Sequence, residues 1–139
     1  MKFLNSGFTL EESNVVIFGV PLGKDSTKSL ESLRYISQFV EPMDLDSGIN
    51  LLENVKLYDI GNITLTSLDK IIGETKKVLT INKIPLILGG NHLSSFYALK
   101  AFDGVKLIVF DAHGDFKDSY ADEKIRNMDT VEGLSFNPK

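Results

Sequence analysis

The chain of 139 residues contains no cysteine and no tryptophan, and it has only two histidines. Without cysteine, neither a disulfide nor a thiolate metal site is available. Any bound metal ion must therefore be held by His, Asp or Glu side chains. This composition is compatible with a reducing compartment, and we expect a cytoplasmic protein.

An excess of basic charge is also missing. Nineteen acidic residues outnumber fifteen Lys and Arg residues, which gives a net charge of −4, and no basic patch with interleaved aromatics occurs. Nucleic-acid binders need clustered cations for phosphate contacts. The N-terminal sequence MKFLNSGFTLEESN lacks the continuous apolar core of a signal peptide. No run approaches the roughly 18 apolar residues of a membrane span. We expect neither a nucleic-acid nor a membrane partner.

What the sequence does have is short apolar runs with little polar alternation. Four of them predict strands, at 14–20, 55–60, 84–90 and 105–111. Runs rich in β-branched residues and Leu, without polar alternation, are typical of parallel strands that are covered on both faces.

The segments between and after these runs have apolar residues at helical spacing. The predicted helices cover 26–41, 67–80 and 94–102. The first has an apolar stripe at spacings of three and four, formed by Leu30, Leu33, Ile36 and Val40. Alternating strands and helices predict an α/β fold, a three-layer α/β/α arrangement with a mainly parallel sheet. We expect residues 1–139 to form a single domain, with a connecting loop at 41–50 and a weakly periodic tail from 118.

The strongest chemical signal is VFDAHGD at 109–115, directly after the fourth apolar run. It places Asp111, His113 and Asp115 on alternate positions. Carboxylate and imidazole ligands suit Mn²⁺, and also Zn²⁺ or Fe²⁺, and two aspartates could bridge a pair of ions. The alternative is structural: the aspartates cap a turn and His113 is a surface histidine.

A second signal, GGNH at 89–92, follows the third apolar run. Its glycines allow a tight turn and close backbone approach, and His92 then lies at the strand end. Alone, the motif is better explained by a helix-capping Asn91 and a buried, hydrogen-bonded His92. However, both histidines of the chain fall at the carboxyl ends of apolar runs, where open parallel sheets bind ligands. Together they favour a metal site.

A third strand-end turn lies in GVPLGKDS at 19–26. It lacks the full phosphate-loop spacing, so nucleotide binding is only weakly indicated. Gly19 and Gly23 are better explained as turn residues, and Lys24 and Asp25 as solvated side chains. We expect this turn, GGNH and DAHGD to share one edge of the molecule.

These motifs together resemble the ureohydrolase family of arginases and agmatinases. GGNH stands where the family has GGDH, and DAHGD matches the family's DAHxD. FGVPLGKDS is similar to the first strand and GVP turn of the family, and DAHGDFKDSYADEK is most similar to the agmatinase form of the motif.

The resemblance implies an arginase-like fold and two Mn²⁺ ions that activate a hydroxide for attack on a guanidinium carbon, releasing urea. Four metal ligands carry over to this chain, His92, Asp111, His113 and Asp115. Asp111 would bridge the two ions, and Asp115 is also assigned to the catalytic group. The implied substrate is a small guanidino compound such as agmatine or arginine.

The chain also departs from the family pattern. Family chains run to around three hundred residues, and the later SxDxDxxDP motif with the two remaining Asp ligands does not occur here. Asn91 replaces an Asp beside the metal ligands, and Asn127 stands where agmatinases have a His linked to proton transfer. The sheet would be truncated, with an open edge that favours association. We expect a homo-oligomer, or a companion chain that supplies the missing half.

Three functional hypotheses follow. The first is an agmatinase-like or arginase-like manganese hydrolase, completed by oligomerisation, a partner or a longer product. The second is a truncated or degenerate ureohydrolase-fold protein, a non-catalytic metal-binding or assembly module. The third, a flavodoxin-like or receiver-like domain, ranks last, because the first strand ends in Val20–Pro21 rather than in paired acids.

Overall fold

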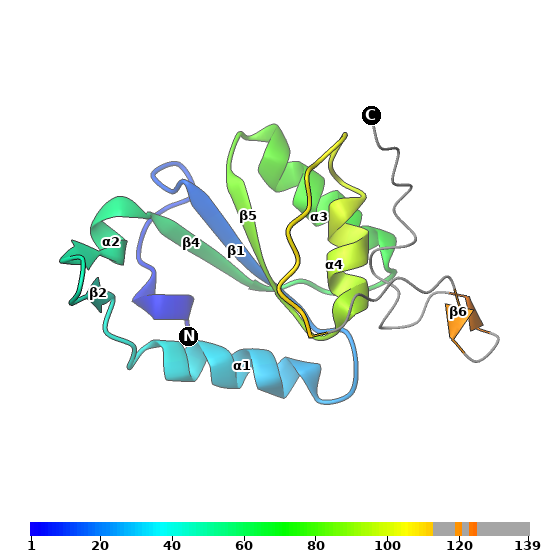
Figure 1. Ribbon diagram of the computed structural model, residues 1–139, viewed down its shortest axis with the longest axis horizontal. Helices are drawn as coiled ribbons and strands as arrows, with labels where there is room; N and C mark the ends of the chain where they lie inside the picture. Colours follow the sequence, from blue (N-terminus) through cyan, green and yellow to red (C-terminus); the bar gives the residue numbers. More distant parts are fainter. Residues whose placement is uncertain (113–118, 121–122, 125–139) are drawn as a thin grey trace.

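The first apolar run forms the central strand of the molecule. In the computed structural model, which describes residues 1–112, 119–120 and 123–124, strand β1 spans Val15–Val20 (Figure 1). Val16, Ile17, Phe18 and Val20 are all buried. A strand whose successive side chains are buried on both faces needs a layer of structure on each side. The absence of polar alternation in this run therefore correctly predicted its burial on both faces.

Two further predicted strands pair with β1 in parallel, which confirms the mainly parallel sheet. The strand order is β4-β1-β5, where β4 spans Leu57–Asn62 and β5 spans Ile84–Gly89. Parallel neighbours need crossover connections, and helices supply them here. The main helices are α1 (Ser26–Ser37), α3 (Asp69–Thr80) and α4 (His92–Leu99).

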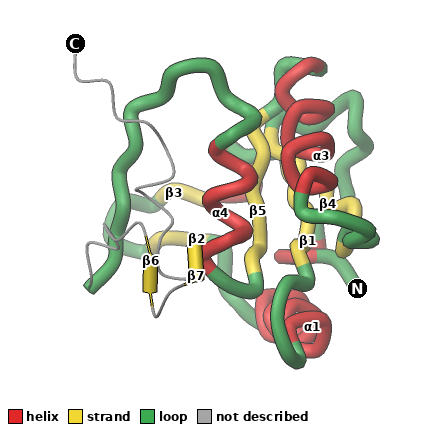
Figure 2. The backbone as a smooth tube through the Cα atoms, turned by 90° about the vertical axis from the view of Figure 1, so that its right-hand side faces the viewer, coloured by secondary structure: helices red, strands yellow, loops and turns green. Residues whose placement is uncertain are grey.

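The helices lie on both faces of the sheet, so the three-layer prediction is confirmed (Figures 1 and 2). Helices α3 and α4 cover one face, where Phe18 of β1 packs in one core cluster with Ile71 and Val78 of α3 and Ala98 of α4. Helix α1 lies on the other face, together with the short 3-10 helix η1 (Phe3–Asn5). No helix among the described residues is long and apolar enough to cross a membrane.

The apolar stripe predicted for α1 is wrong in most of its members. Leu30 is buried, but Leu33, Ile36 and Val40 are exposed. The helix instead turns its Leu30, Arg34 and Ser37 side toward the sheet. These positions are four and three residues apart and therefore share a face. The helix also ends at Ser37, four residues before the predicted end, and turn-like hydrogen bonds follow, such as Phe39 N to Ile36 O.

A buried ion pair explains why this polar side of α1 faces inward. Arg34 donates from Nε to Asp59 Oδ2 at 2.7 Å and from Nη2 to Asp59 Oδ1 at 3.1 Å, with the side chains 5% and 0% exposed. Arg34 Nη1 also donates to Asn62 Oδ1 at 2.6 Å, and the backbone N–H of Phe3 donates to Asp59 Oδ2. A planar guanidinium satisfies a carboxylate with two bonds in this geometry. The network links α1, β4 and the N-terminal 3-10 helix η1.

The fourth predicted strand, 105–111, does not form among the described residues. Residues 105–110 have no strand assignment, and Val105, Ile108, Val109 and Phe110 are exposed. In Figure 1 this segment runs in the same direction as β5, and Figure 2 shows it set off from the sheet beyond α4. An apolar run becomes a strand only when a neighbour takes its backbone hydrogen bonds. No described strand does so here.

Smaller elements complete the described chain. The predicted loop at 41–50 contains an antiparallel pair, β2 (Met43–Asp44) and β3 (Ile49–Asn50), and α2 follows at Leu51–Asn54. In the predicted tail, β6 (Ser119–Tyr120) pairs with β7 (Glu123–Lys124). Most of the tail lies outside the described residues.

Candidate metal centre

The GGNH turn is tightly built against the turn that follows β1. Strand β5 ends at Gly89, and a Cβ added to Gly90 would lie only 2.1 Å from the backbone oxygen of Leu22. Gly23, at φ +108°, lies next to Asn91, whose Nδ2 would be 3.7 Å from a Cβ at that glycine. Glycine is needed where two backbones approach this closely. The strand ends of β1 and β5 therefore share one edge, as the sequence predicts.

His92 is the first residue of α4, and its side chain is 49% exposed. Asn91 occupies the N-cap position in an extended conformation, but its side chain makes no capping hydrogen bond. The structural explanation of this motif required a capping Asn91 and a buried His92. Neither feature is found, so that explanation is wrong.

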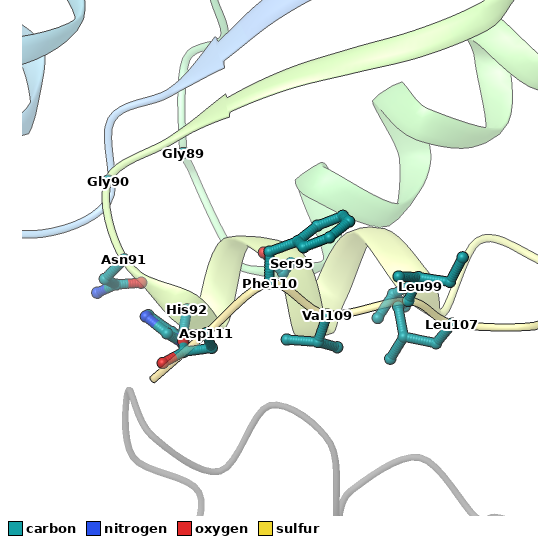
Figure 3. A pocket seen from close by; sticks show the side chains of 11 residues that line it. Gly89, Gly90, Asn91, His92, Ser95, Leu99, Leu107, Val109, Phe110 and Asp111 are labelled. Atoms are coloured by element: carbon teal, nitrogen blue, oxygen red, sulfur yellow. The ribbon is translucent and has the colours of Figure 1, made fainter. Parts of the chain in front are cut away.

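Asp111 reaches the same place from the segment that follows α4. Its Oδ2 lies 3.7 Å from His92 Nδ1, and Figure 3 shows the two side chains pointing toward one another. One comes from the N-terminus of a helix after β5, and the other from the end of the fourth apolar run. An imidazole and a carboxylate brought together in this way form part of a typical ligand set for divalent metal ions.

The two side chains lie at a cavity of about 490 Å³. The end of β5 and the start of α4 form one wall, residues 107–111 form another, and Ser95 and Leu99 of α4 also line it (Figure 3). A cavity of this size falls in the range of small-molecule sites. Ser95 and Leu99 carry no signal that would separate them from ordinary helix residues, and sequence reasoning did not identify them.

The other two predicted ligands, His113 and Asp115, lie outside the described residues, as does Asn127. Within the described part of the chain, no group of three or more His, Asp and Glu side chains comes together. The structure thus brings together two of the four predicted ligands. Their role in metal binding, and that of Asp115 in catalysis, stay predictions.

The donor chemistry at this edge fits a hard or borderline divalent cation. His92 offers an imidazole nitrogen and Asp111 a carboxylate oxygen, with no sulfur donor anywhere in the chain. Beside them, Asn91 Oδ1 is buried and has no hydrogen-bond partner among the described residues. Buried hydrogen-bond acceptors normally have a partner. This oxygen therefore marks a place where a further group that donates a hydrogen bond fits.

The three-layer architecture with its parallel sheet is that of a known family of α/β proteins. The family model of the arginase family matches residues 13–131, and the chain belongs to this family. The match covers β1, β4 and β5 with the helices between them, and it includes both histidines.

Among its relatives is the agmatinase of Bacillus cereus, which is 36% identical over 93% of this chain and 50% of its own length. The crystal structure of the agmatine ureohydrolase of Thermoplasma volcanium has a TM-score of 0.79 and 26% identity, over 95% of this chain and 49% of that one. Trypanosoma cruzi formiminoglutamase, solved with Mn²⁺, shares the fold, with a TM-score of 0.71 and 22% identity over 96% and 52% of the two chains. The chain spans about half the length of each.

Proposed function

We propose that this chain provides part of the manganese site of an agmatinase-like hydrolase, which cleaves a guanidino group and releases urea. The observation that carries the proposal is the convergence of His92 and Asp111 at the carboxyl edge of the sheet. Membership of the arginase family and the similarity to agmatinases support the reaction class. Agmatine is the first substrate to test, with arginine next.

His92, Asp111, His113 and Asp115 would hold the metal. Two Mn²⁺ ions would supply activation of water and stabilisation of the charge that develops at the guanidino carbon. Other residues of the chain position the ligands. The close approach of Gly90 to Leu22 fixes the turn before His92.

Residues 1–139 would act as a single unit that corresponds to the N-terminal half of a ureohydrolase. The relatives are about twice as long as this chain, and a segment equivalent to their other half would hold the remaining metal ligands and the rest of the substrate pocket. We propose that this segment is the continuation of a longer product, a companion chain equivalent to the other half, or another copy of this chain.

Urea release is the direct test. The purified chain is assayed with saturating Mn²⁺ on agmatine, arginine and other guanidino compounds, both alone and co-expressed with the C-terminal half of the Bacillus cereus agmatinase. We expect Mn²⁺-dependent urea release only when the second polypeptide is present. No urea from any guanidino compound, in a sample that does contain both polypeptides, contradicts the proposal.

A non-catalytic role is the second candidate, and Asn91 favours it. An amide stands here where the resemblance to the family implies a carboxylate, so a negative charge directly beside His92 is missing. In that case the chain is a metal-binding or assembly module of the arginase fold. Its signature is Mn²⁺ binding by the assembled protein without urea release.

A further inference from the structure

A second cavity lies between helix α1 and the end of strand β4. Its volume is about 550 Å³, which is in the range of small-molecule sites. Helix α1 lines it with Glu31, Arg34 and Tyr35, and the end of β4 lines it with Gly61 and Asn62. It shares no lining residue with the cavity at the candidate metal centre, and α1 and α4 lie on opposite faces of the sheet (Figure 1). We call this second cavity the α1–β4 hollow.

The positive charge of Arg34 at the wall of the hollow already has its partners. Its Nε and Nη2 donate to the carboxylate of Asp59, and its Nη1 donates to Asn62 Oδ1. The Arg34 and Asp59 side chains are both buried, and their charges cancel. This pair therefore gives the hollow a fixed wall with little net charge.

Glu31 supplies the hollow with a negative charge that no described residue compensates. It forms no ion pair within the described part of the chain, whereas Lys28, one turn earlier, pairs with Asp25 at 3.9 Å. The cation one turn later, Arg34, is held by Asp59. An uncompensated carboxylate at a cavity attracts cations and repels anions. The hollow therefore favours a positively charged ligand.

Tyr35 adds an aromatic ring on the same side of α1. It follows Glu31 by four residues, so the two side chains are neighbours on the helix surface. Tyr35 is 52% exposed, and its ring packs edge-to-face against Phe39 with centroids 5.2 Å apart. Among the described residues no lysine lies over this ring, although lysines lie over the rings of Phe8, Tyr58, Phe96 and Tyr97. Tyr35 thus has ring surface for a cation from outside the chain.

We infer that the α1–β4 hollow binds a small organic cation with an alkyl body, either an alkylammonium or an alkylguanidinium ion. The charged head would lie between the Glu31 carboxylate and the Tyr35 ring, because a carboxylate and an aromatic face both attract such a head. Met1 also lines the hollow, and its flexible apolar side chain would contact the alkyl body.

Neither the metal ions nor the proposed reaction is required for this binding. Hydrolysis of an alkylguanidinium ion to urea leaves an alkylammonium ion, so the two head groups are those of the substrate and the product of the proposed hydrolase. A ligand in the hollow would leave the strand-end cavity free, because the two cavities share no lining residue. The hollow is therefore a second site for this class of compound.

The experiment is an NMR titration of the full, metal-free chain with n-butylammonium and n-butylguanidinium as separate probes and n-butanol as the uncharged control. Two variants change the hollow: Glu31→Gln removes the charge, and Tyr35→Leu removes the ring. Glu11→Gln is the matched control, because Glu11 is an exposed acid that does not line the hollow. Asp111→Asn tests whether the probes bind at the strand-end cavity instead. Circular dichroism verifies that each variant is folded.

We expect saturable shifts of the amide signals of the hollow with at least one cationic probe, and binding weakened about two- to fivefold in Glu31→Gln and in Tyr35→Leu. Glu11→Gln and Asp111→Asn should bind as the wild type does. A preference for n-butylammonium supports the inference with the product as ligand, and a preference for n-butylguanidinium supports it with the substrate as ligand.

The inference is overturned if neither cationic probe binds saturably, if n-butanol binds equally well, or if Glu31→Gln binds as tightly as the wild type. Loss of binding in Asp111→Asn also overturns it, because the probe would then occupy the strand-end cavity. Binding in the hollow by a protein that releases no urea leaves this inference standing and removes the proposed function. Urea release without binding in the hollow does the reverse.

Discussion

His92 Nδ1 lies 3.7 Å from Asp111 Oδ2, although the two residues come from different elements. One begins α4 and the other ends the fourth apolar run. The separation is longer than a hydrogen bond, and the two side chains face one another beside the cavity. Convergence of an imidazole and a carboxylate at the carboxyl edge of a parallel sheet is the relationship on which the metal-site proposal depends.

Loss of any one of the proposed ligands should weaken Mn²⁺ binding. We expect His92→Ala, Asp111→Asn and His113→Ala each to lower the affinity of the assembled protein by at least about tenfold, since each removes a donor atom. Titration calorimetry measures the change. Ser95→Ala is the matched control, because Ser95 lines the same cavity but is not a proposed ligand. Equal affinities for His92→Ala and Ser95→Ala would exclude His92 as a ligand.

The turn before His92 should be sensitive to a single methyl group. In Gly90→Ala the new Cβ would meet the backbone oxygen of Leu22 at 2.1 Å, and no side-chain rotation can relieve a backbone contact. We expect a destabilisation of about 1–3 kcal/mol and weaker Mn²⁺ binding, because the turn must shift.

The same substitution elsewhere provides the control for Gly90→Ala. A Cβ at Gly73, in the middle of α3, would meet nothing within 4 Å. Gly73→Ala should raise the free energy of unfolding by about 0.4–1 kcal/mol and leave metal affinity unchanged. Denaturant unfolding of both variants measures the difference. If Gly90→Ala is as stable as Gly73→Ala, the close approach to Leu22 does not restrict the residue at position 90 to glycine.

The buried Arg34–Asp59 pair should dominate the polar contribution to stability. Asp59→Asn leaves a buried guanidinium without its counter-charge, and we expect a loss of about 3–5 kcal/mol. Replacing both partners, as in Arg34→Met with Asp59→Leu, should recover much of this loss, because no unpaired charge stays buried. If the double variant is less stable than Asp59→Asn, the ion pair stabilises the fold by more than the neutralisation of each buried charge by the other.

The same pair predicts how stability depends on pH. Burial raises the pKa of Asp59, but the bonds from Arg34 and from the N–H groups of Phe3 and Gly61 outweigh it and hold the pKa below its usual value. A carboxyl whose pKa is lowered on folding stabilises the protein above its unfolded pKa, and this stability is lost as the pH falls through the lowered value. The wild type should therefore lose stability below about pH 4.

Unfolding by denaturant across an acid pH series tests this dependence against Asp59→Asn. The difference in unfolding free energy between the two proteins should be constant near neutral pH and should shrink as the pH falls below about 4. A difference that does not change down to the lowest pH at which both fold would mean that Asp59 is not the titrating group.

The sequence predicted those parts of the fold that depend on local pattern. The run VVIFGV is typical of a strand covered on both faces, and β1 is such a strand. The run at 105–111 has the same apolar character but forms no described strand, because a strand also needs a hydrogen-bonded neighbour. No local signal tells whether that neighbour is present.

The same limit applies to the side chains. The stripe of Leu33, Ile36 and Val40 predicted the wrong buried face of α1, because the pairing of Arg34 with Asp59 is a contact between distant parts of the chain. An Asp in the middle of an apolar run, at position 59, was the available signal for a buried partner. His92 and Asp111 could be predicted as neighbours because the sequence itself shows where each apolar run ends.

The most direct test of the central claim is the number of Mn²⁺ ions bound by the protein assembled with the C-terminal half, determined by elemental analysis after saturation and gel filtration. The proposal predicts about two ions per 1:1 complex, as a two-metal site requires, and fewer in His92→Ala. An assembled complex without bound Mn²⁺ would contradict it. His92 and Asp111 would then face one another for structural reasons alone.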